Sequence, residues 1–156
     1  GDPDRVRPMP QAKVVLDCLR SQGIATGVLS NQSGIGRGIL TFEEVAAVNV
    51  RIEQLLGPFD VWDICPHRPE DGCSCRKPAP GLIRRACRRL GIAPGETAYV
   101  GDIGSDIAAA RAAGVRGVMV PTAVTLPAEV ETAPEVAADL RSAILLLLQA
   151  TGRNVL

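Results

Sequence analysis

The chain has 156 residues, of which 46% are hydrophobic and 22% are charged, as is typical of one globular domain of the soluble class with its own core. Its 17 basic and 17 acidic residues give zero formal net charge, so no overall field favours nucleic acid or a membrane surface. The longest purely apolar run, residues 143–148, is too short to cross a bilayer, and the N-terminus lacks the apolar stretch of a signal peptide. We therefore expect a cytoplasmic monomer with reduced thiols and with neither nucleic-acid nor membrane partners.

In the first half of the chain, an apolar stripe with helical spacing predicts a helix over residues 11–22, and a strand over residues 24–30 follows it. A second apolar stripe predicts a helix over residues 42–56. Thr41 and Glu44 have the spacing of a capping box at its start. A glycine-rich loop connects this helix to the preceding strand.

In the second half, strands and helices continue to alternate. The expected elements are a strand over 59–65, a helix from Pro80 to Gly91, a strand over 97–101, a helix over 105–113, a strand over 115–120 and a helix over 139–150. This alternation predicts a single α/β domain over residues 1–156, in which a parallel sheet is covered by helices on both faces.

Three cysteines and the only histidine lie close together in residues 65–75, with the spacing C-x-H-x5-C-x-C. Thiolates and imidazole suit tetrahedral Zn²⁺, and four protein ligands leave no open position, so the predicted metal is structural. The predicted zinc ligands are Cys65, His67, Cys73 and Cys75.

The alternative interpretations of these residues are a disulfide pair or small core side chains. Cys73 and Cys75 are too close in sequence for an easy mutual disulfide, and the segment is rich in proline and charge, unlike a core strand. Cys18 and Cys87 lie inside helical patterns, and we expect both to be small buried side chains.

Polar residues follow the predicted strands. Residues 30–33 follow the first strand, Arg76 and Lys77 end the cysteine-rich loop, and Asp102 follows a later strand, with Asp106 four residues further on. Ligands of open parallel sheets bind at the carboxyl ends of the strands, so we expect these side chains to share one site.

The segments Ser-Asn-Gln-Ser-Gly, Cys-Arg-Lys-Pro-x-Pro-Gly and Val-Gly-Asp-x-x-x-Asp occur in this order at residues 30–34, 75–81 and 100–106. Together they resemble the motifs of the haloacid dehalogenase (HAD) superfamily of phosphatases, over about residues 8–125. The cysteine-rich loop narrows the resemblance to the branch that hydrolyses heptose 1,7-bisphosphate at C7 or histidinol phosphate. The resemblance implies a three-layer Rossmann-like fold without a large cap, and a small phosphorylated sugar or metabolite as substrate.

The resemblance also implies roles for individual residues. Ser30 matches the residue whose hydroxyl bonds a phosphoryl oxygen, and Lys77 matches the cation that offsets the charge of the phosphoryl group. Both would stabilise the charge that spreads over the phosphoryl oxygens during transfer. Substrate-contacting positions are matched by Asn31, Gln32, Ser33 and Arg76.

The expected cofactors are Mg²⁺ and the structural Zn²⁺. Asp102 matches the carboxylate ligand of Mg²⁺, a hard ion that prefers oxygen. Asp106 is a second candidate for the magnesium shell. The alternative for Asp106 is a carboxylate that the dipole favours in the first turn of a helix.

The first motif of the family is absent. Members attack phosphorus with an aspartate at the end of an apolar strand, in Asp-x-Asp-Gly, and no apolar strand precedes residue 11. Asp2 and Asp4 have the spacing but lack the strand and the glycine. We expect an N-terminally truncated domain, inactive by itself, whose missing strand leaves two interior sheet edges unpaired.

Two other classes of protein share features with this sequence. Residues 34–38 contain Gly-x-Gly-x-Gly after a strand, but this is not the G-x-G-x-x-G spacing of a dinucleotide-binding oxidoreductase. The other class is a zinc-stabilised, non-catalytic phosphate-binding module, which fits a chain without a nucleophile. The sequence leaves that possibility open.

Overall fold

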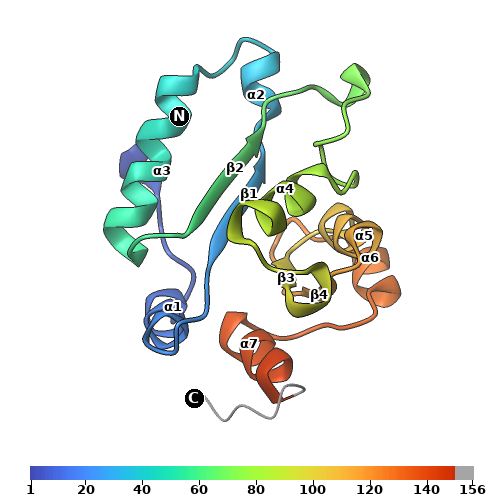
Figure 1. The fold of residues 1–156 in the computed structure, drawn as a ribbon. Coiled ribbons are helices and arrows are strands. Elements are labelled where there is room, and N and C mark those ends of the chain that lie inside the picture. The colour runs from blue at the N-terminus through green and yellow to red at the C-terminus, as the bar shows by residue number, and fades with distance from the viewer. Residues whose placement is uncertain (150–156) are drawn as a thin grey trace.

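The computed structural model describes residues 1–149, and Figure 1 shows their arrangement. The helices are α1 (Ala12–Ser21), α2 (Ser33–Gly36), α3 (Phe42–Leu56), α4 (Gly81–Leu90), α5 (Gly104–Ala113), α6 (Pro127–Thr132) and α7 (Leu140–Gln149). The strands are β1 (Gly27–Asn31), β2 (Val61–Cys65), β3 (Ala98–Gly101) and β4 (Arg116–Met119).

The five predicted helices correspond to α1, α3, α4, α5 and α7, and the four predicted strands to β1–β4. The capping box before α3 is present: the Glu44 N–H donates to the Thr41 hydroxyl, and the Thr41 N–H donates to the Glu44 carboxylate. The short helices α2 and α6 were not predicted. The predicted end of the last helix, residue 150, lies outside the described residues.

The strands form two parallel pairs. β1 pairs with β2 in a register that places Gly27 beside Val61 and Asn31 beside Cys65. β3 pairs with β4, and the segment around Val136 runs along the far edge of β4. Within residues 1–149, β1 and β3 each keep one edge without a strand partner. These are the two unpaired interior edges that the sequence predicts.

The open edge of β1 faces β3. The Thr26 carbonyl and the Gln32 N–H both form hydrogen bonds on the β2 side of the strand. In a parallel strand, the backbone N–H and C=O groups of every second residue point to the same side. Leu29, at an odd position between them, therefore turns its carbonyl away from β2. That carbonyl accepts hydrogen bonds from the Tyr99 hydroxyl of β3 and from the Lys77 ammonium.

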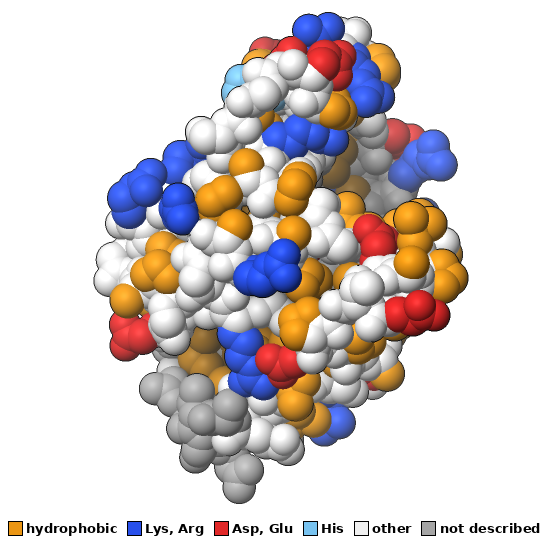
Figure 2. Space-filling view, turned by 90° about the vertical axis from the view of Figure 1, so that its right-hand side faces the viewer, with side chains coloured by type: hydrophobic (Ala, Val, Ile, Leu, Met, Phe, Trp, Pro, Cys, Tyr) orange, Lys and Arg blue, Asp and Glu red, His pale blue; other side chains and the backbone are white. Residues whose placement is uncertain are grey.

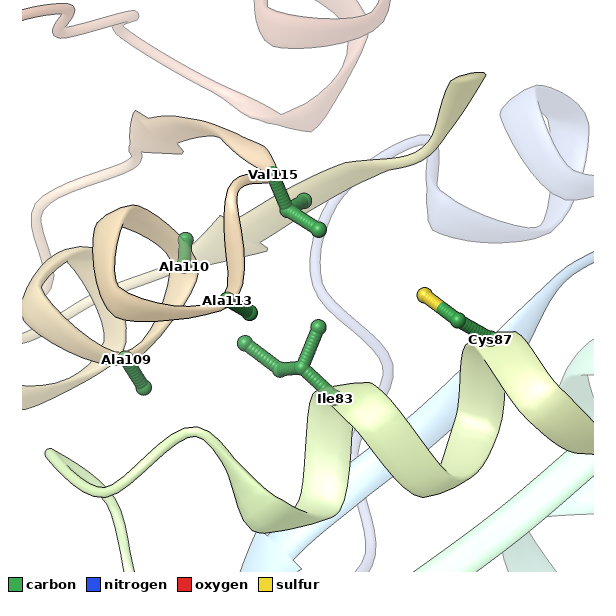
Figure 3. Close-up of a cluster of buried hydrophobic side chains, with 6 residues drawn as sticks. All are labelled: Ile83, Cys87, Ala109, Ala110, Ala113 and Val115. Carbon is green, nitrogen blue, oxygen red and sulfur yellow. The ribbon is translucent and has the colours of Figure 1, made fainter. Parts of the chain in front are cut away.

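The helices cover both faces of the strands. Tyr99 packs against a cluster that joins α4 to α5, while its neighbour Val100 packs against a cluster around α7. Successive side chains of a strand point to opposite faces, so these two groups of helices lie on opposite sides. The structure therefore has the predicted three layers. Figure 3 shows the cluster between α4 and α5, which consists of Ile83, Cys87, Ala109, Ala110, Ala113 and Val115.

The two cysteines outside the predicted zinc loop differ in burial. Cys87 is buried in the cluster between α4 and α5, as predicted. Cys18 is only partly buried, so the prediction was wrong for this residue. The reason is its place on α1, where the buried stripe is formed by Ala12, Val15 and Leu19.

Candidate functional site

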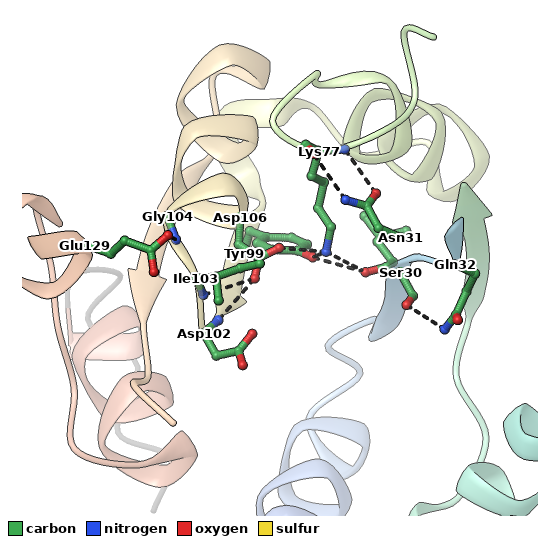
Figure 4. Close-up of polar contacts among 11 residues, drawn as sticks. Ser30, Asn31, Gln32, Lys77, Tyr99, Asp102, Ile103, Gly104, Asp106 and Glu129 are labelled. Atoms are coloured by element: carbon green, nitrogen blue, oxygen red, sulfur yellow. Dashed lines mark hydrogen bonds and ion pairs between the residues drawn. The ribbon is translucent and has the colours of Figure 1, made fainter. Parts of the chain in front are cut away.

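Six of the residues predicted for the phosphate site lie near the carboxyl ends of β1 and β3 (Figure 4): Ser30, Asn31, Gln32, Lys77, Asp102 and Asp106. Ser30 lies in β1, and Asp102 directly follows β3. Lys77 comes from the loop between β2 and α4, and its ammonium reaches the Leu29 carbonyl at 3.1 Å. The loop therefore brings a cation to the gap between the two strand pairs.

The Lys77 ammonium has three close acceptors. It donates to the Leu29 carbonyl at 3.1 Å and to the Tyr99 hydroxyl at 2.8 Å, and it forms an ion pair with Asp106 Oδ1 at 2.6 Å. Only 9% of the Lys77 side chain and 5% of the Asp106 side chain are exposed. A buried ion pair of this kind stabilises the fold only while both partners are present.

The protonation of this cluster follows from its contacts. Burial alone would lower the pKa of Lys77, but Tyr99 and Asp106 outweigh burial and raise that pKa. Burial raises the pKa of Tyr99, although the Lys77 charge opposes this effect. Both shifts keep Lys77 positively charged and Tyr99 neutral at physiological pH.

Asp106 has both carboxylate oxygens engaged inside the protein. Oδ1 faces the Lys77 ammonium, and Oδ2 accepts from the N–H groups of Asp102 and Ile103 at 3.1 and 3.4 Å. A Cβ on Gly101 would lie 2.3 Å from the Asp106 Cβ, so only glycine permits this approach. Asp106 therefore caps α5 and orders the backbone around Asp102.

Asp102 is oriented by two threonines that the sequence did not single out. Thr122 Oγ1 donates to Asp102 Oδ2 at 3.0 Å, and Thr125 Oγ1 donates to the Asp102 carbonyl at 2.6 Å. Glu129 of α6 contacts the same region, since it accepts from the Gly104 N–H at 2.9 Å. Carboxylate oxygen suits Mg²⁺, so Asp102 has the chemistry of a magnesium ligand.

The residues that follow Leu29 have distinct contacts. Gln32 Nε2 donates to the Ser30 hydroxyl at 2.9 Å, which leaves the hydroxyl proton of Ser30 available for an acceptor. The Asn31 side chain pairs with the backbone of Lys77. Ser33 is the first residue of α2. Arg76 Nη1 donates to the His67 carbonyl at 3.4 Å, so its guanidinium lies beside the cysteine-rich loop.

The four predicted zinc ligands converge. Their ligand atoms all lie within 4.8 Å of one another, and the sulfur of Cys75 lies 3.0 Å from that of Cys65 and 3.2 Å from His67 Nδ1. Zn–S bonds of about 2.3 Å in a tetrahedron place sulfurs about 3.8 Å apart, so the cluster has the size and the ligand set of a zinc site. His67 is exposed, and Figure 2 shows the pale-blue histidine colour at the surface of the protein.

The pKa values of the thiols in the cluster differ. Burial, followed by the neighbouring thiols, raises the pKa of Cys65 to about 12. For Cys73, burial alone would raise the pKa, but the Arg76 N–H and the neighbouring cysteines outweigh it and lower the pKa to about 7. Cys73 therefore becomes a thiolate more readily than Cys65. A divalent metal would stabilise the thiolate form of all three.

The cysteine-rich loop is tied directly to the start of α4. The Gly81 N–H donates to the Ser74 carbonyl at 3.0 Å. A Cβ on Gly81 would lie 2.2 Å from that carbonyl oxygen, so the close approach requires glycine. Arg76 and Lys77 lie between these two fixed points. The cluster and α4 therefore limit the position of the Lys77 backbone.

Comparison with known proteins agrees with this fold. Residues 74–143 match the family model described as HAD-hydrolase-like. The chain is 35% identical, over 74% of its own length and 67% of the relative's, to D-glycero-β-D-manno-heptose-1,7-bisphosphate 7-phosphatase of Pseudomonas aeruginosa. The enzyme of the same name from Yersinia pestis is 34% identical over 75% of this chain and 69% of its own.

Solved structures give the same result. The D,D-heptose 1,7-bisphosphate phosphatase of Bordetella bronchiseptica, complexed with magnesium and phosphate, superposes with a TM-score of 0.84, at 28% identity, over 96% of this chain and 88% of its own. A HAD-like phosphatase of Mesorhizobium loti gives 0.78, at 30% identity, over 98% and 79%.

The fold and the site together define a phosphohydrolase domain of the α/β type. The chain belongs to the HAD family of phosphatases. Within that family, its relatives include enzymes named for heptose bisphosphate. No helix in residues 1–149 has both the length and the apolar character needed to cross a membrane.

Removal of Lys77 from its ion pair with Asp106 should destabilise the fold. Lys77→Met leaves a buried carboxylate without its cation, so we expect the free energy of unfolding to fall by about 3 kcal/mol. Adding Asp106→Asn should recover part of this loss, because the amide is neutral. Urea unfolding at pH 7 measures both effects.

The control is Lys13→Met, which breaks an exposed ion pair with Asp17 and should cost far less. The pKa of Lys77 is raised above its usual 10.5 in the folded state, so the stabilisation is complete below pH 10.5 and is lost as the pH rises through the higher folded value. Equal stability of the wild type and Lys77→Met at pH 7 would contradict this role.

Proposed function

We propose that this domain serves Mg²⁺-dependent phosphomonoester hydrolysis, with the 7-phosphate of D-glycero-D-manno-heptose 1,7-bisphosphate as substrate. The observation that carries the proposal is the convergence of Ser30, Lys77 and Asp102 near the carboxyl ends of β1 and β3. The names of the relatives, and the magnesium and phosphate in the Bordetella structure, support the substrate class and the ion.

Each residue has a part in this reaction that its chemistry allows. Asp102, held by Thr122, would bind Mg²⁺, which supplies positive charge to the phosphoryl oxygens when bound. The Ser30 hydroxyl would donate to one phosphoryl oxygen. Lys77 would stabilise the charge that develops during transfer, and Arg76, the residue before it in the loop, would recognise the substrate.

The nucleophile would come from a strand in the gap between β1 and β3. Asp2 precedes a 3-10 helix at Pro3–Arg5, and Asp4 lies within it. Both are exposed and neither lies on a strand, so neither would provide the nucleophile. A strand beside β1 would bond to the Leu29 carbonyl, which Lys77 and Tyr99 now share. We propose that this strand lies upstream in a longer chain, and that its aspartate forms an aspartyl-phosphate.

A second candidate function is phosphate binding without hydrolysis. The position of Asp2 and Asp4 favours it for the chain as it stands, because no carboxylate of residues 1–149 occupies the gap as a nucleophile on a strand. The two functions differ in turnover and share the same phosphate site, so an assay of a longer chain distinguishes them.

We propose that Zn²⁺ occupies the cluster of Cys65, His67, Cys73 and Cys75 and has a structural role. The sulfur and nitrogen atoms have suitable separations, and the Arg76 N–H points at the Cys73 sulfur at 3.4 Å. A zinc ion would therefore fix the residue next to Lys77. Reduced thiols also fit the proposed cytoplasmic location, and a monomer suffices because one chain supplies all four ligands.

Metal analysis tests the zinc proposal. Protein purified without added zinc should contain about one zinc per chain, and Cys73→Ala should lose the ion and increase amide exchange in the loop around Lys77. Cys87→Ala is the matched control, because Cys87 is a buried cysteine outside the cluster and should leave the zinc content unchanged. Full zinc content in Cys73→Ala would exclude the proposed ligand set.

Turnover tests the function. A version that carries the upstream strand should release phosphate from heptose 1,7-bisphosphate with Mg²⁺, faster than from histidinol phosphate, the alternative substrate. Lys77→Ala in that version should lower kcat by at least a hundredfold, since it removes a preorganised charge from the transition state. The chain of residues 1–156 alone should be inactive.

Three results would contradict the proposal: phosphate release by residues 1–156 alone, unchanged kcat in Lys77→Ala, or a preference for histidinol phosphate. The last would overturn only the substrate. Tight phosphate binding with no turnover by the longer version would favour the binding module.

A further inference from the structure

The side chain of Asn31 forms hydrogen bonds with both backbone polar groups of Lys77. Its Oδ1 accepts from the Lys77 N–H at 3.1 Å, and its Nδ2 donates to the Lys77 carbonyl at 3.1 Å. Figure 4 shows the two contacts side by side between the end of β1 and the loop above it. The amide thus bonds Lys77 as a neighbouring strand would bond it.

Within the described residues, these two bonds are the hydrogen bonds of the Lys77 backbone. The turns around it are closed by other residues, as in the bond from the Ala79 N–H to the Arg76 carbonyl. Lys77 is itself buried, and buried backbone groups require partners. Removal of the Asn31 amide would leave a donor and an acceptor of Lys77 unpaired.

The two ends of Lys77 are therefore held by different groups. The Asn31 side chain holds the peptide, while Asp106, Tyr99 and the Leu29 carbonyl of β1 hold the ammonium. A lysine stem has four rotatable carbons, so a fixed ammonium alone would not fix the backbone. The position of the ammonium relative to the Ser30 hydroxyl depends on both anchors, and small displacements of a catalytic group are costly.

We propose that Asn31 is a positioning residue, which acts by holding the backbone of Lys77 rather than by binding the substrate through its own side chain. This role rests on the proposed function, because the place of Lys77 matters for catalysis only if Lys77 meets a phosphoryl group. It also assigns Asn31 a different role from the substrate contact that the family resemblance implies. The two roles predict different behaviour of the free protein.

Backbone amide exchange of the unliganded chain, measured by NMR, is the first test. In Asn31→Ala the Lys77 amide should exchange at least tenfold faster than in the wild type, because its acceptor is lost. Gln32→Ala is the matched control, since Gln32 lies next in sequence and its side chain bonds Ser30 instead. The Lys77 amide should keep its protection in Gln32→Ala.

Asn31→Asp is a second variant, which keeps the shape and the acceptor of asparagine. It should retain the protection of the Lys77 amide and change the carbonyl carbon shift of Lys77, because the carboxylate cannot donate. This variant keeps the test decisive if Asn31→Ala does not fold. Unchanged exchange of the Lys77 amide in Asn31→Ala, or an unchanged Lys77 carbonyl shift in Asn31→Asp, would overturn the proposal.

A double-mutant cycle on the affinity for inorganic phosphate, with Mg²⁺ present, separates the two roles. If Asn31 acts through Lys77, then Asn31→Ala should weaken phosphate binding in the wild type and have no further effect in Lys77→Ala. Equal weakening in both backgrounds would indicate a direct substrate contact and overturn the proposal. Absence of phosphate binding in the wild type would contradict the proposed function alone, because the exchange measurement does not require a ligand.

Discussion

The buried contact between Lys77 and Asp106 is the interaction on which the site depends. It joins a loop anchored to the first strand pair with the helix that follows β3, across a gap in which, among residues 1–149, the facing edges of β1 and β3 have no strand partner. The cation is costly to bury, so its acceptors must all be in place. The same requirement that stabilises the fold therefore determines where the positive charge of the site lies.

The surrounding structure fixes this contact from several directions. The cysteine and histidine cluster holds the start of the loop, the close approach of Gly81 to Ser74 holds its end, and Asn31 holds Lys77 itself. On the opposite side, Asp106 bonds the N–H groups around Asp102. The negative and positive parts of the site are thus positioned by one connected network of hydrogen bonds.

The sequence predicted most of the fold because its signals are local. Helical periodicity, the capping box at Thr41 and the alternation of strands with helices located the main elements to within a few residues. The cysteine and histidine spacing predicted which four side chains converge. The helices α2 and α6 were missed because they are short and carry no apolar stripe long enough to detect.

The parts of the site that the sequence did not predict depend on contacts between residues that are far apart in the chain. Asn31 and Lys77 are 46 positions apart, and Tyr99 meets Leu29 across 70 positions. A motif indicates that Asn31 is near the phosphate, but only the folded chain shows that its amide bonds the Lys77 backbone. The same holds for Thr122, which lies 20 positions along the sequence from Asp102, whose carboxylate it orients.

The most direct measurement is a crystal structure of the chain with Mg²⁺ and inorganic phosphate. We expect one phosphate whose oxygens lie at hydrogen-bond distance, about 3 Å, from Ser30 Oγ and Lys77 Nζ, beside a metal ion bound by Asp102. A phosphate bound elsewhere, with Lys77 and Asp102 both distant from it, would contradict the account.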